Sequence, residues 1–575
     1  MYQKSSIKIE LSSPQLYIGN PFKNAKNIIE ILNKSKANFV LFAELCLSSY
    51  TAGDLFFDNF FLKENLKALN FIINNNHFQG VYFIGMPFCF QELIYNVAIV
   101  IQKKKILGIV PKHTIPNYKE FSEKRWFQSG KFLQNKFVNF LGQTVPFGNI
   151  LFINKKFDII FGVEICQDLW TIESPSDLLT LNGAHLIFNL SASTEHIGKS
   201  ELRKMAVLNH SRKQIGGYFY TSSGISETVT DHIFSNHKIA AVLGEIIGEK
   251  DLFNQDISLL VDVFVDVIKY QRRIDTTYGD QKIGKEIVFL KSYFDLKECE
   301  FYNFEKDFDK KPFVSEINIK ENLKIASSIQ FFALQSKILQ IPDIKIVLEM
   351  KEELNHFLTL FTVIKVLNDN FKDLKKLNII LNSDFFADKN LFQLLKHFFN
   401  KNKINIILNN IFYKKEKNDK LLILENYNLS NIAIGQINHS KQNYDFLYNL
   451  NIGISNTFIT ELILFNLNKN ELKIDDSLKK IYLNKINNFL TQSIIIEDFI
   501  LYHYLKHNFS EEKISFLIKK VFYINIDKSL EIVKKYMNNF FQSQYKRQII
   551  SPGPKIFEYS LSNRTEFKLP IYLQK

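Results

Sequence analysis

Cysteine is scarce in this chain. Its 575 residues include four cysteines, Cys46, Cys89, Cys166 and Cys299, and no two of them have the Cys-x-x-Cys spacing of a metal site. So few and so widely spaced thiols argue against a disulfide framework and against a structural zinc site. They favour a reducing compartment, and no metal ligands are expected.

Long apolar runs are also lacking. No run approaches the roughly 18 apolar residues that begin to suggest a membrane-spanning helix. Residues 1–15 have no apolar core followed by a small-residue cleavage site. We therefore expect neither a membrane partner nor a secretory signal, and we expect a cytoplasmic protein.

A compact basic stripe is missing, although the formal net charge is +13. Lysine is spread along the chain together with Asn, Ile and Phe, all residues with AT-rich codons, and no RNA- or DNA-binding signature is present. A biased codon pool explains this charge better than a nucleic-acid partner does. No nucleic-acid binding is therefore expected.

The length and the apolar content predict two packed α/β domains. A chain of 575 residues is too long for one core, and 46 % hydrophobic residues are typical of globular domains. In the first half, short apolar runs alternate with helical patterns. The expected strands are residues 7–11, 38–43, 81–85, 97–101, 106–110, 158–163, 184–189 and 259–267, with a helix over 24–35.

The second half repeats the α/β pattern after a stretch without clear periodicity. We predict a first domain over residues 1–275, a linker or inter-domain arm over 276–325, and a second domain over 326–575. Within the second domain, strands are expected at 344–348, 379–381, 404–408 and 421–424, a helix over 354–364, and mostly helix over 475–541.

Three chemically active residues each follow a hydrophobic strand of the first half. Glu44, Lys112 and Cys166 stand at these strand ends, and strands of a common sheet can bring their carboxyl ends together. A carboxylate can take the proton of a thiol, and an ammonium with the backbone N–H of Gln167 can stabilise a tetrahedral oxyanion. The set predicts acyl transfer from a side-chain amide through a thioester.

Each of these residues also has an ordinary structural interpretation. A lone buried cysteine is more often a small hydrophobic residue than a nucleophile. A glutamate or lysine at a strand end is more often a solvated rim residue. Three such coincidences in sequence order weaken these interpretations without removing them.

The sequence motifs around these residues resemble those of the carbon–nitrogen hydrolase (nitrilase) superfamily, specifically the glutaminase domain of glutamine-dependent NAD synthetases. The matching motifs, in the family's order and spacing from the start of the chain to about residue 275, are Phe42-Ala-Glu44-Leu-Cys-Leu-Ser-Ser-Tyr50, Pro111-Lys112-His-Thr-Ile-Pro-Asn-Tyr118, Phe121-Ser-Glu123-Lys-Arg125-Trp-Phe127, Glu164-Ile-Cys166-Gln-Asp168-Leu-Trp170 and Asn189-Leu-Ser-Ala-Ser193 with Lys199 and Arg203.

This resemblance implies a fold, a reaction and a set of roles. It implies an α-β-β-α sandwich, with Glu44 as the base, Lys112 as the lysine and Cys166 as the nucleophile of a glutaminase that needs no cofactor. It implies Glu123 as an acid that positions Lys112 or the substrate amide. The substrate, glutamine or a related ω-amide, would be bound by Tyr118, Phe121, Glu123, Gln167, Ser193 and Lys199.

Gln167 departs from the family's pattern, which has glutamate directly after the nucleophile. A carboxylate there would attract the α-ammonium group of glutamine, whereas a neutral amide can only form a hydrogen bond with it. The departure leaves the affinity for glutamine, and the identity of the amide, open.

The second half resembles the synthetase domain of the same family. The match rests on three motifs near the end of the chain, Phe540-Phe-Gln-Ser-Gln-Tyr-Lys546-Arg547, Pro552-Gly-Pro-Lys555 and Ser560-Leu-Ser562. A fourth motif, Asn428-Leu-Ser-Asn431-Ile-Ala-Ile-Gly435, stands where the family has an Asp-Leu-Ser-Glu segment. The resemblance implies a doubly wound sheet of the adenine-nucleotide α-hydrolase type. It also implies homo-oligomers, because the family assembles through both domains.

The ATP loop of that family is degenerate here. The family's Ser-Gly-Gly-x-Asp-Ser loop forms an anion nest from backbone N–H groups at a helix start. The equivalent residues are Lys351, Glu352, Glu353, Leu354, Asn355 and His356, and the chain contains no other Ser-Gly-Gly. The two glutamates add β-carbons and negative charge where pyrophosphate would lie. Asn428, Asn431 and Asn443 replace acidic residues, and Asn456 replaces a lysine.

Three functions follow as hypotheses. The first is an amide hydrolase, most simply a glutaminase, that carries an inactive synthetase half. The second is a complete glutamine-hydrolysing NAD synthase, which would require ATP and Mg²⁺. The third is a non-catalytic assembly subunit that retains only the family's shape.

Overall fold

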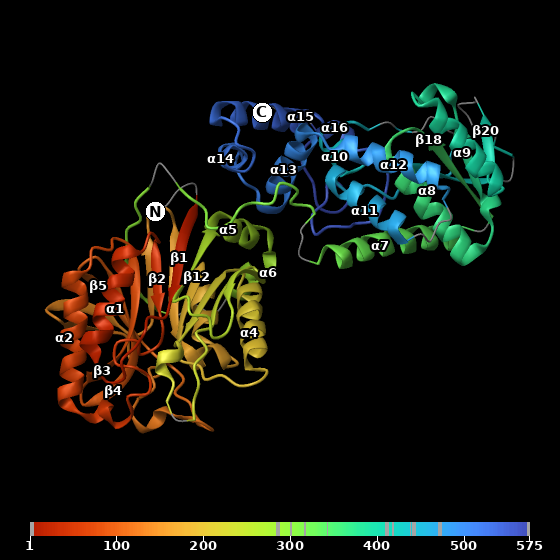
Figure 1. Ribbon diagram of the computed structural model, residues 1–575. Coiled ribbons are helices and arrows are strands. Elements are labelled where there is room, and N and C mark those ends of the chain that lie inside the picture. The colour runs from red at the N-terminus through yellow and green to blue at the C-terminus, as the bar shows by residue number, and fades with distance from the viewer. Residues whose placement is uncertain are drawn as a thin grey trace. The chain divides into compact units, whose positions relative to one another are not determined.

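The computed structural model describes residues 5–229, 231–282, 288–298, 302–314, 318–341, 343–408, 413, 415–416, 419–437, 439, 444–469 and 474–571. The chain divides into two compact units, Met1–Lys306 and Asp307–Lys575 (Figure 1). Cys299 and Asn443, which the sequence analysis singled out, lie outside the described residues.

The first unit contains two facing β-sheets. In its described residues the larger sheet has eight strands in the order β16-β1-β2-β3-β4-β5-β9-β8. These are β1 (Ser6–Ser12), β2 (Phe39–Phe42), β3 (Val81–Phe90), β4 (Leu93–Gln102), β5 (Lys105–Pro111), β8 (Lys136–Phe140), β9 (Gln143–Phe147) and β16 (Ser258–Phe264). The expected strands at 7–11, 38–43 and 106–110 are confirmed within a residue or two, whereas β3 runs five residues beyond the expected 81–85 and β4 begins four residues before the expected 97–101.

The second sheet has seven strands in the order β15-β14-β13-β12-β11-β10-β17 among the described residues. They are β10 (Ile150–Asn154), β11 (Ile159–Ile165), β12 (Leu186–Ser191), β13 (Gly217–Ser222), β14 (Lys238–Val242), β15 (Glu245–Lys250) and β17 (Leu290–Tyr293). A short ribbon, β6 (Asn117–Tyr118) with β7 (Phe121–Ser122), stands apart from both sheets.

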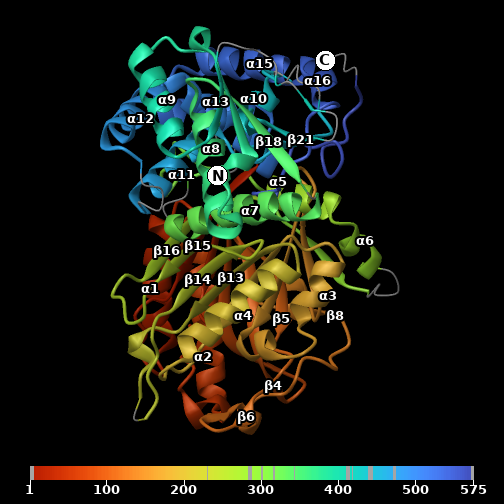
Figure 2. The ribbon, with the colours of Figure 1, turned by 90° about the vertical axis from the view of Figure 1, so that its right-hand side faces the viewer.

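Helices cover the outer faces of the two sheets and complete an α-β-β-α sandwich (Figures 1 and 2). One apolar cluster joins α1 (Pro21–Lys34) and α2 (Asn59–Asn75) to the first sheet, and another joins α3 (Pro175–Leu181) and α4 (Lys199–Lys213) to the second. Between the sheets lies a phenylalanine-rich core, in which Phe39 of the first sheet meets Phe161 of the second with ring centroids 5.5 Å apart. The nitrilase-like sandwich expected for this half is confirmed.

The remaining elements of the first unit are short. They are α5 (Val265–Ile274), α6 (Thr276–Lys282) and the single turns η1 (Gly53–Phe57), η2 (Glu123–Arg125), η3 (Cys166–Trp170) and η4 (Ile225–Glu227). The strand expected over 259–267 ends at Phe264, because the chain turns into α5 at Val265. The segment 276–325 is not a linker throughout, since β17 pairs with β10 in the sheet and a helix begins at Ile319.

The second unit is built on a parallel sheet in the order β20-β19-β18-β21-β22 among its described residues. The strands are β18 (Ile344–Met350), β19 (Leu377–Leu381), β20 (Asn405–Leu408), β21 (Lys420–Glu425) and β22 (Phe446–Asn449). The first strand of the chain order lies in the middle, which is the doubly wound arrangement expected from the sequence. Its topological switch point lies between β18 and β21, the usual place for a ligand.

Helices make up most of the rest of the second unit. They are α7 (Ile319–Gln340), α8 (Leu354–Val366), α9 (Lys389–Lys401), α10 (Leu429–Ala433), α11 (Asn456–Lys469), α12 (Asp476–Phe489), α13 (Gln492–His507), α14 (Glu511–Phe522), α15 (Ile526–Gln542) and α16 (Gln544–Arg547), with the turns η5 (Leu367–Phe371), η6 (Leu374–Lys376) and η7 (Ser383–Phe385). The mainly helical character expected for 475–541 is confirmed.

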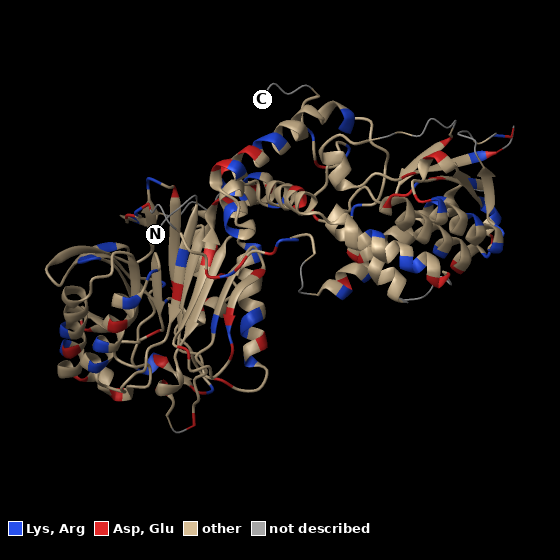
Figure 3. Cartoon of the chain, turned by 45° about the horizontal axis from the view of Figure 1, so that its top comes forward, with Lys and Arg blue, Asp and Glu red and all other residues tan. Residues whose placement is uncertain are grey.

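Charged residues of both signs occur together on the helices in the view of Figure 3. Among the described residues, no helix combines the length and the apolar character needed to cross a membrane. In the same part of the chain, no group of three or more His, Cys, Asp or Glu side chains is arranged to hold a metal ion.

Candidate active site

Glu44, Lys112 and Cys166 come from the ends of three strands. Glu44 follows β2, Lys112 follows β5, and Cys166 follows β11. The sequence analysis expected one common sheet, and this detail is wrong, because β11 belongs to the second sheet. The sheets face each other, and the Glu44 amide donates to the carbonyl of Ser191 at the end of β12 at 3.2 Å, which ties the strand ends together.

Lys112 links two buried carboxylates. Its Nζ lies 2.6 Å from Oε1 of Glu44, and 2.8 and 2.7 Å from the two oxygens of Glu123. The side chains of Glu44 and Lys112 are 0 % exposed. Burial alone would lower the pKa of Lys112, but the charges of Glu123 and Glu44 raise it overall, so the ammonium stays charged.

Glu44 uses only one of its oxygens in this network. Oε1 also accepts a hydrogen bond from the side-chain amide of Asn96 at 2.7 Å. Oε2 is buried and has no hydrogen-bond partner among the described residues. A buried carboxylate oxygen without a partner is uncommon in proteins, and it is free to receive a proton.

Glu123 is the second carboxylate of the site. It lies in η2, and its Oε1 also accepts a hydrogen bond from the hydroxyl of Tyr50 at 2.8 Å. Burial raises the pKa of Glu123 to about 7, Lys112 opposes this rise, and Glu44 adds to it. Glu123 therefore holds Nζ of Lys112 through both of its oxygens, and its role in positioning Lys112 or the substrate amide stays a prediction.

Cys166 opens η3 in a left-handed backbone conformation, with φ of 44°. Such a conformation is costly for a residue with a side chain, and it is characteristic of functional turns. The thiol is 6 % exposed, and burial together with the charge of Glu44 raises its pKa to about 12, against the charge of Lys112. The thiol of Cys166 is thus protonated at neutral pH, and the charges of Glu44 and Lys112 act on it in opposite directions.

The predicted substrate residues lie around this centre. The hydroxyl of Tyr118 donates to Oε1 of Gln167 at 2.8 Å, and the Tyr118 and Phe121 rings meet edge to face with centroids 5.8 Å apart. Nζ of Lys199 lies 5.0 Å from the centroid of Phe121. Burial lowers the pKa of Lys199, and the charge of Glu120 opposes this shift.

Ser193 and Lys199 belong to a layer of buried polar groups. Nη2 of Arg203 lies 3.3 Å from the hydroxyl of Ser193, and Nζ of Lys199 lies 3.2 Å from the hydroxyl of Thr194 and 3.6 Å from the carboxylate of Glu120. Tyr118 thus contacts Gln167 and Phe121, and Lys199 lies over the Phe121 ring. Their roles in substrate binding, and that of Ser193, stay predictions.

Comparison with known proteins finds similarity mainly in this unit. Residues 18–254 match the model of the carbon-nitrogen hydrolase family. The chain is 27% identical over 288 residues to the glutamine-dependent NAD(+) synthetase of Mycobacterium bovis, a match that covers 49% of this chain and 42% of the relative.

Two further likenesses concern enzymes of the same name. The chain is 31% identical over 266 residues to the glutamine-dependent NAD(+) synthetase of Thermotoga maritima, which covers 45% of this chain and 42% of the relative. The crystal structure of a glutamine-dependent NAD(+) synthetase from Cytophaga hutchinsonii aligns over 99% of this chain and 98% of that one, with 15% identity and a TM-score of 0.41. The matches to the Mycobacterium bovis and Thermotoga maritima enzymes each span less than half of the relative's length.

Several residues of this candidate site were missed by the sequence analysis. Asn96 and Tyr50 hold the two carboxylates, and Asn189 accepts a hydrogen bond from the backbone N–H of Cys166 at 3.2 Å. Asn189 begins one of the motifs that resemble the family, and Asn96 is a polar residue inside an apolar strand. These signals mark both residues as unusual, but they do not reveal that Asn189 contacts Cys166 or that Asn96 contacts Glu44.

The segment from Lys351 to Glu353 lies between β18 and α8, and Asn355 and His356 belong to the first turn of α8. Glu352 turns toward the start of α9, where its Oε2 accepts from the amides of Ala387 and Asp388 at 2.7 and 3.2 Å, and it pairs with Lys485. Glu353 stands at the N-cap position of α8 and makes no capping hydrogen bond there.

A network of asparagine side chains lies beside this loop. The side-chain amide of Asn355 donates to Asn431 at 3.0 Å, and that of Asn428 donates to Asn355 at 3.1 Å and to Asn456 at 2.6 Å. Asn428 and Asn431 also cap each other at the start of α10. These neutral side chains satisfy one another and leave no carboxylate among them to hold a metal ion.

Proposed function

We propose that the first unit hydrolyses the side-chain amide of glutamine to glutamate and ammonia. Cys166 is the nucleophile, Glu44 is the base, and Lys112 stabilises the oxyanion. The observation that carries this proposal is the unpartnered Oε2 of Glu44, because its other oxygen is already held by Lys112 and Asn96. The first step needs such a free acceptor close to the thiol.

The acylation step transfers one proton and forms one bond. Because the pKa of Cys166 is about 12, almost no thiolate exists at neutral pH, and the proton must move to Glu44 as the sulfur attacks the amide carbon. The oxyanion receives hydrogen bonds from Lys112 and from the backbone N–H of Gln167. Glu44 then returns the proton to the nitrogen, the C–N bond breaks, and ammonia leaves.

The deacylation step repeats this proton transfer with water. Glu44 takes a proton from a water molecule, whose oxygen attacks the thioester carbon. The C–S bond breaks, Glu44 gives its proton to the sulfur of Cys166, and the carboxylic acid product leaves. No redox change occurs, and no metal or cofactor takes part in either step.

The polar groups around the thiol support an amino-acid amide as the substrate. Lys199 offers a positive charge for a carboxylate, and Glu120 offers a negative charge for an ammonium group. Gln167 offers only a neutral amide, which is held by Tyr118. The relatives named as glutamine-dependent enzymes support glutamine within this class.

Ammonia release from glutamine by the purified full chain tests this proposal. We expect steady release that Cys166→Ala abolishes, because no other group at this centre replaces the thiol. Absence of Cys166-dependent release from glutamine and from other ω-amides would contradict it, and would favour the assembly-subunit hypothesis instead.

We also propose that the second unit does not activate a substrate with ATP. The residues at the switch point do not fit a triphosphate with Mg²⁺, because Glu349, Glu353 and Glu425 line the cavity there and Glu353 stands at the start of α8. Negative side chains at this helix start oppose a phosphate group. No step through ATP is therefore derived for this chain.

An assay supplied with ammonia tests the activity of the second unit independently of glutamine hydrolysis by the first. The full chain would be incubated with deamido-NAD, ATP, Mg²⁺ and ammonium chloride, so that a failing glutaminase cannot limit the reaction. We expect no NAD. Robust synthesis under these conditions would establish the complete glutamine-dependent synthase and refute this part of the proposal.

A further inference from the structure

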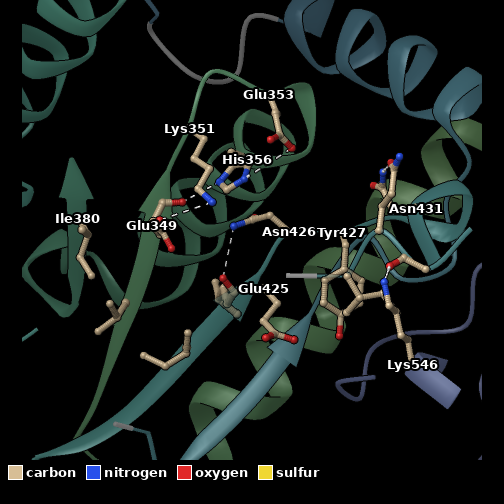
Figure 4. Close-up of a pocket in the computed structure, with 16 residues that line it drawn as sticks. Glu349, Lys351, Glu353, His356, Ile380, Glu425, Asn426, Tyr427, Asn431 and Lys546 are labelled. Atoms are coloured by element: carbon tan, nitrogen blue, oxygen red, sulfur yellow. Dashed lines mark hydrogen bonds and ion pairs between the residues drawn. The ribbon is translucent and has the colours of Figure 1, made fainter. Parts of the chain in front are cut away.

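The second unit has a cavity of about 390 Å³ at its topological switch point, which we call the switch-point cavity. Its walls come from the ends of β18 and β21, the start of α8 and the loop after α10. In Figure 4, Glu349, Lys351, Glu353 and His356 form one part of the wall, and Glu425, Asn426 and Tyr427 come from the other strand end. A volume of this size accommodates a small organic molecule.

His356 presents a hydrogen-bond acceptor to this cavity. Its Nδ1 lies 2.7 Å from the carbonyl oxygen of Glu349, and a carbonyl can only accept, so the proton is on Nδ1. Burial lowers the pKa of His356 to about 4, so the ring is neutral at pH 7. Its Nε2 then carries a lone pair and no proton.

A second acceptor faces this ring nitrogen. Oε2 of Glu353 lies 4.0 Å from Nε2 of His356, which is too long for a hydrogen bond. With a neutral ring, the two atoms are both acceptors, and they cannot satisfy each other. A donor placed between them would bond to both.

The positive charges of the lining are already engaged. Lys351 lies 3.6 Å from Glu349, and Lys546 donates to the carbonyl of Gly435 at 2.9 Å. Three carboxylates and two ammonium groups line the cavity, and Glu353 is 65 % exposed toward it and solvent. Glu349 shares this ion pair with Lys351, and Glu425 accepts a hydrogen bond from Ser551 and lies 3.1 Å from His439. Glu353 is therefore the exposed carboxylate of the described lining, and it favours a positively charged ligand.

We propose that the switch-point cavity binds a small organic cation whose ammonium or guanidinium group donates to Glu353 and to Nε2 of His356. The ligand carries no phosphate, because the loop offers carboxylates where a phosphate-binding loop offers backbone amides. This site is independent of the Cys166 centre, and its test does not depend on amide hydrolysis.

Titration calorimetry on the full chain tests the site, with agmatine as the main probe and putrescine as the second. Agmatine has a guanidinium group at one end and an ammonium group at the other. Sodium chloride of equal ionic strength controls for general screening. We expect saturable binding of agmatine at one site per chain, and no binding of ATP with Mg²⁺.

Two variants identify the site. We expect Glu353→Gln to weaken agmatine binding at least tenfold, because it removes the charge while the side chain makes no capping bond. Glu321→Gln, an exposed carboxylate in the first turn of α7, is the matched control and should bind as the wild type does. If Glu353→Gln unfolds at a lower temperature, His356→Asn, which keeps a donor toward Glu349 and lacks Nε2, replaces it.

Three results would overturn the proposal. One is the absence of saturable binding by both amines. Another is unchanged binding in Glu353→Gln and His356→Asn, since the amine would then bind elsewhere. The third is tighter binding of ATP than of either amine by the wild type.

Discussion

The backbone N–H of Cys166 donates a hydrogen bond to Oδ1 of Asn189 at 3.2 Å. This contact holds the left-handed turn at the nucleophile from a neighbouring strand. Asn189 is itself held by the hydroxyl of Ser191, which donates to the same oxygen at 2.7 Å, and by the hydroxyl of Tyr218, which accepts from its amide at 2.9 Å.

The contact also determines which backbone N–H group in the turn can bind an oxyanion. Since the N–H of Cys166 is committed to Asn189, it is not available for an oxyanion. The N–H of Gln167, one residue further along η3, is the next candidate in the turn. Asn189 is therefore a positioning residue, which acts through the geometry of the nucleophile.

Replacing Asn189 with alanine should lower kcat for ammonia release while KM changes little. The buried N–H of Cys166 would lose its partner, at a cost of about 1–3 kcal/mol. If the whole cost appears in the transition state, kcat falls roughly 5–150-fold. Steady-state kinetics with glutamine measures this split.

Asn74→Ala is the matched control, because Asn74 is exposed on α2 and bonds only within its own helix. Its kinetics should equal those of the wild type. A rise in KM with unchanged kcat in Asn189→Ala would show that Asn189 serves substrate binding instead of the nucleophile.

Glu44→Gln should remove most of the amide hydrolysis. The neutral side chain can keep a contact with Lys112, but it cannot take the proton of a thiol whose pKa is about 12. General base catalysis contributes about 10²–10⁴-fold, and a loss of that size is expected in kcat. Steady-state ammonia release from glutamine measures this loss.

Glu64→Gln provides the comparison, since Glu64 pairs with Lys67 on the surface of α2. That variant should retain full activity. An activity of Glu44→Gln within a few-fold of the wild type would rule out Glu44 as the base.

The chemistry of the triad could be predicted from the sequence because each residue stands directly after an apolar run. The pairing of the strands could not be predicted in the same way. The runs before Glu44 and Cys166 look alike as sequences, although one lies in each sheet. Apolar alternation indicates a strand and its buried face, and it carries no information on which strands are neighbours.

The polar partners of the site were harder to find for a related reason. Asn189 contacts Cys166 across 23 positions, and Asn96 contacts Glu44 across 52. An asparagine in a strand has many possible partners at such separations, and only the fold selects one. In contrast, the strand, loop and helix around Lys351 and Glu353 are local, and the sequence predicted them well.

Gln167→Glu should strengthen glutamine binding and leave the chemistry unchanged. A carboxylate at this position can still accept the hydrogen bond of Tyr118, which Oε1 of Gln167 accepts at 2.8 Å. It adds a negative charge for the α-ammonium group of glutamine, and a charge-assisted hydrogen bond is worth about 1.5–3 kcal/mol. We expect KM for glutamine to fall about tenfold with kcat nearly constant.

Propionamide separates this effect from a general change of the site, because it has the amide without the ammonium group. Its KM should not change in Gln167→Glu. Gln281→Glu, an exposed change on α6, should alter neither substrate. An equal fall in KM for glutamine and propionamide would show that Gln167 does not discriminate by charge.

His356 should make the second unit less stable in mild acid. Burial lowers its pKa from 6.5 to about 4, so between these pH values the folded chain binds fewer protons than the unfolded chain. Its contribution is therefore present above pH 6.5 and is lost as the pH falls toward 4, by at most roughly 3 kcal/mol.

His356→Asn keeps a donor for the carbonyl of Glu349 and removes the titration. Calorimetric unfolding at pH 7 and at pH 4.5 should give a smaller drop in Tm for this variant than for the wild type. His397→Asn, an exposed change on α9, should drop as the wild type does, and equal drops in all three proteins would contradict a titrating His356.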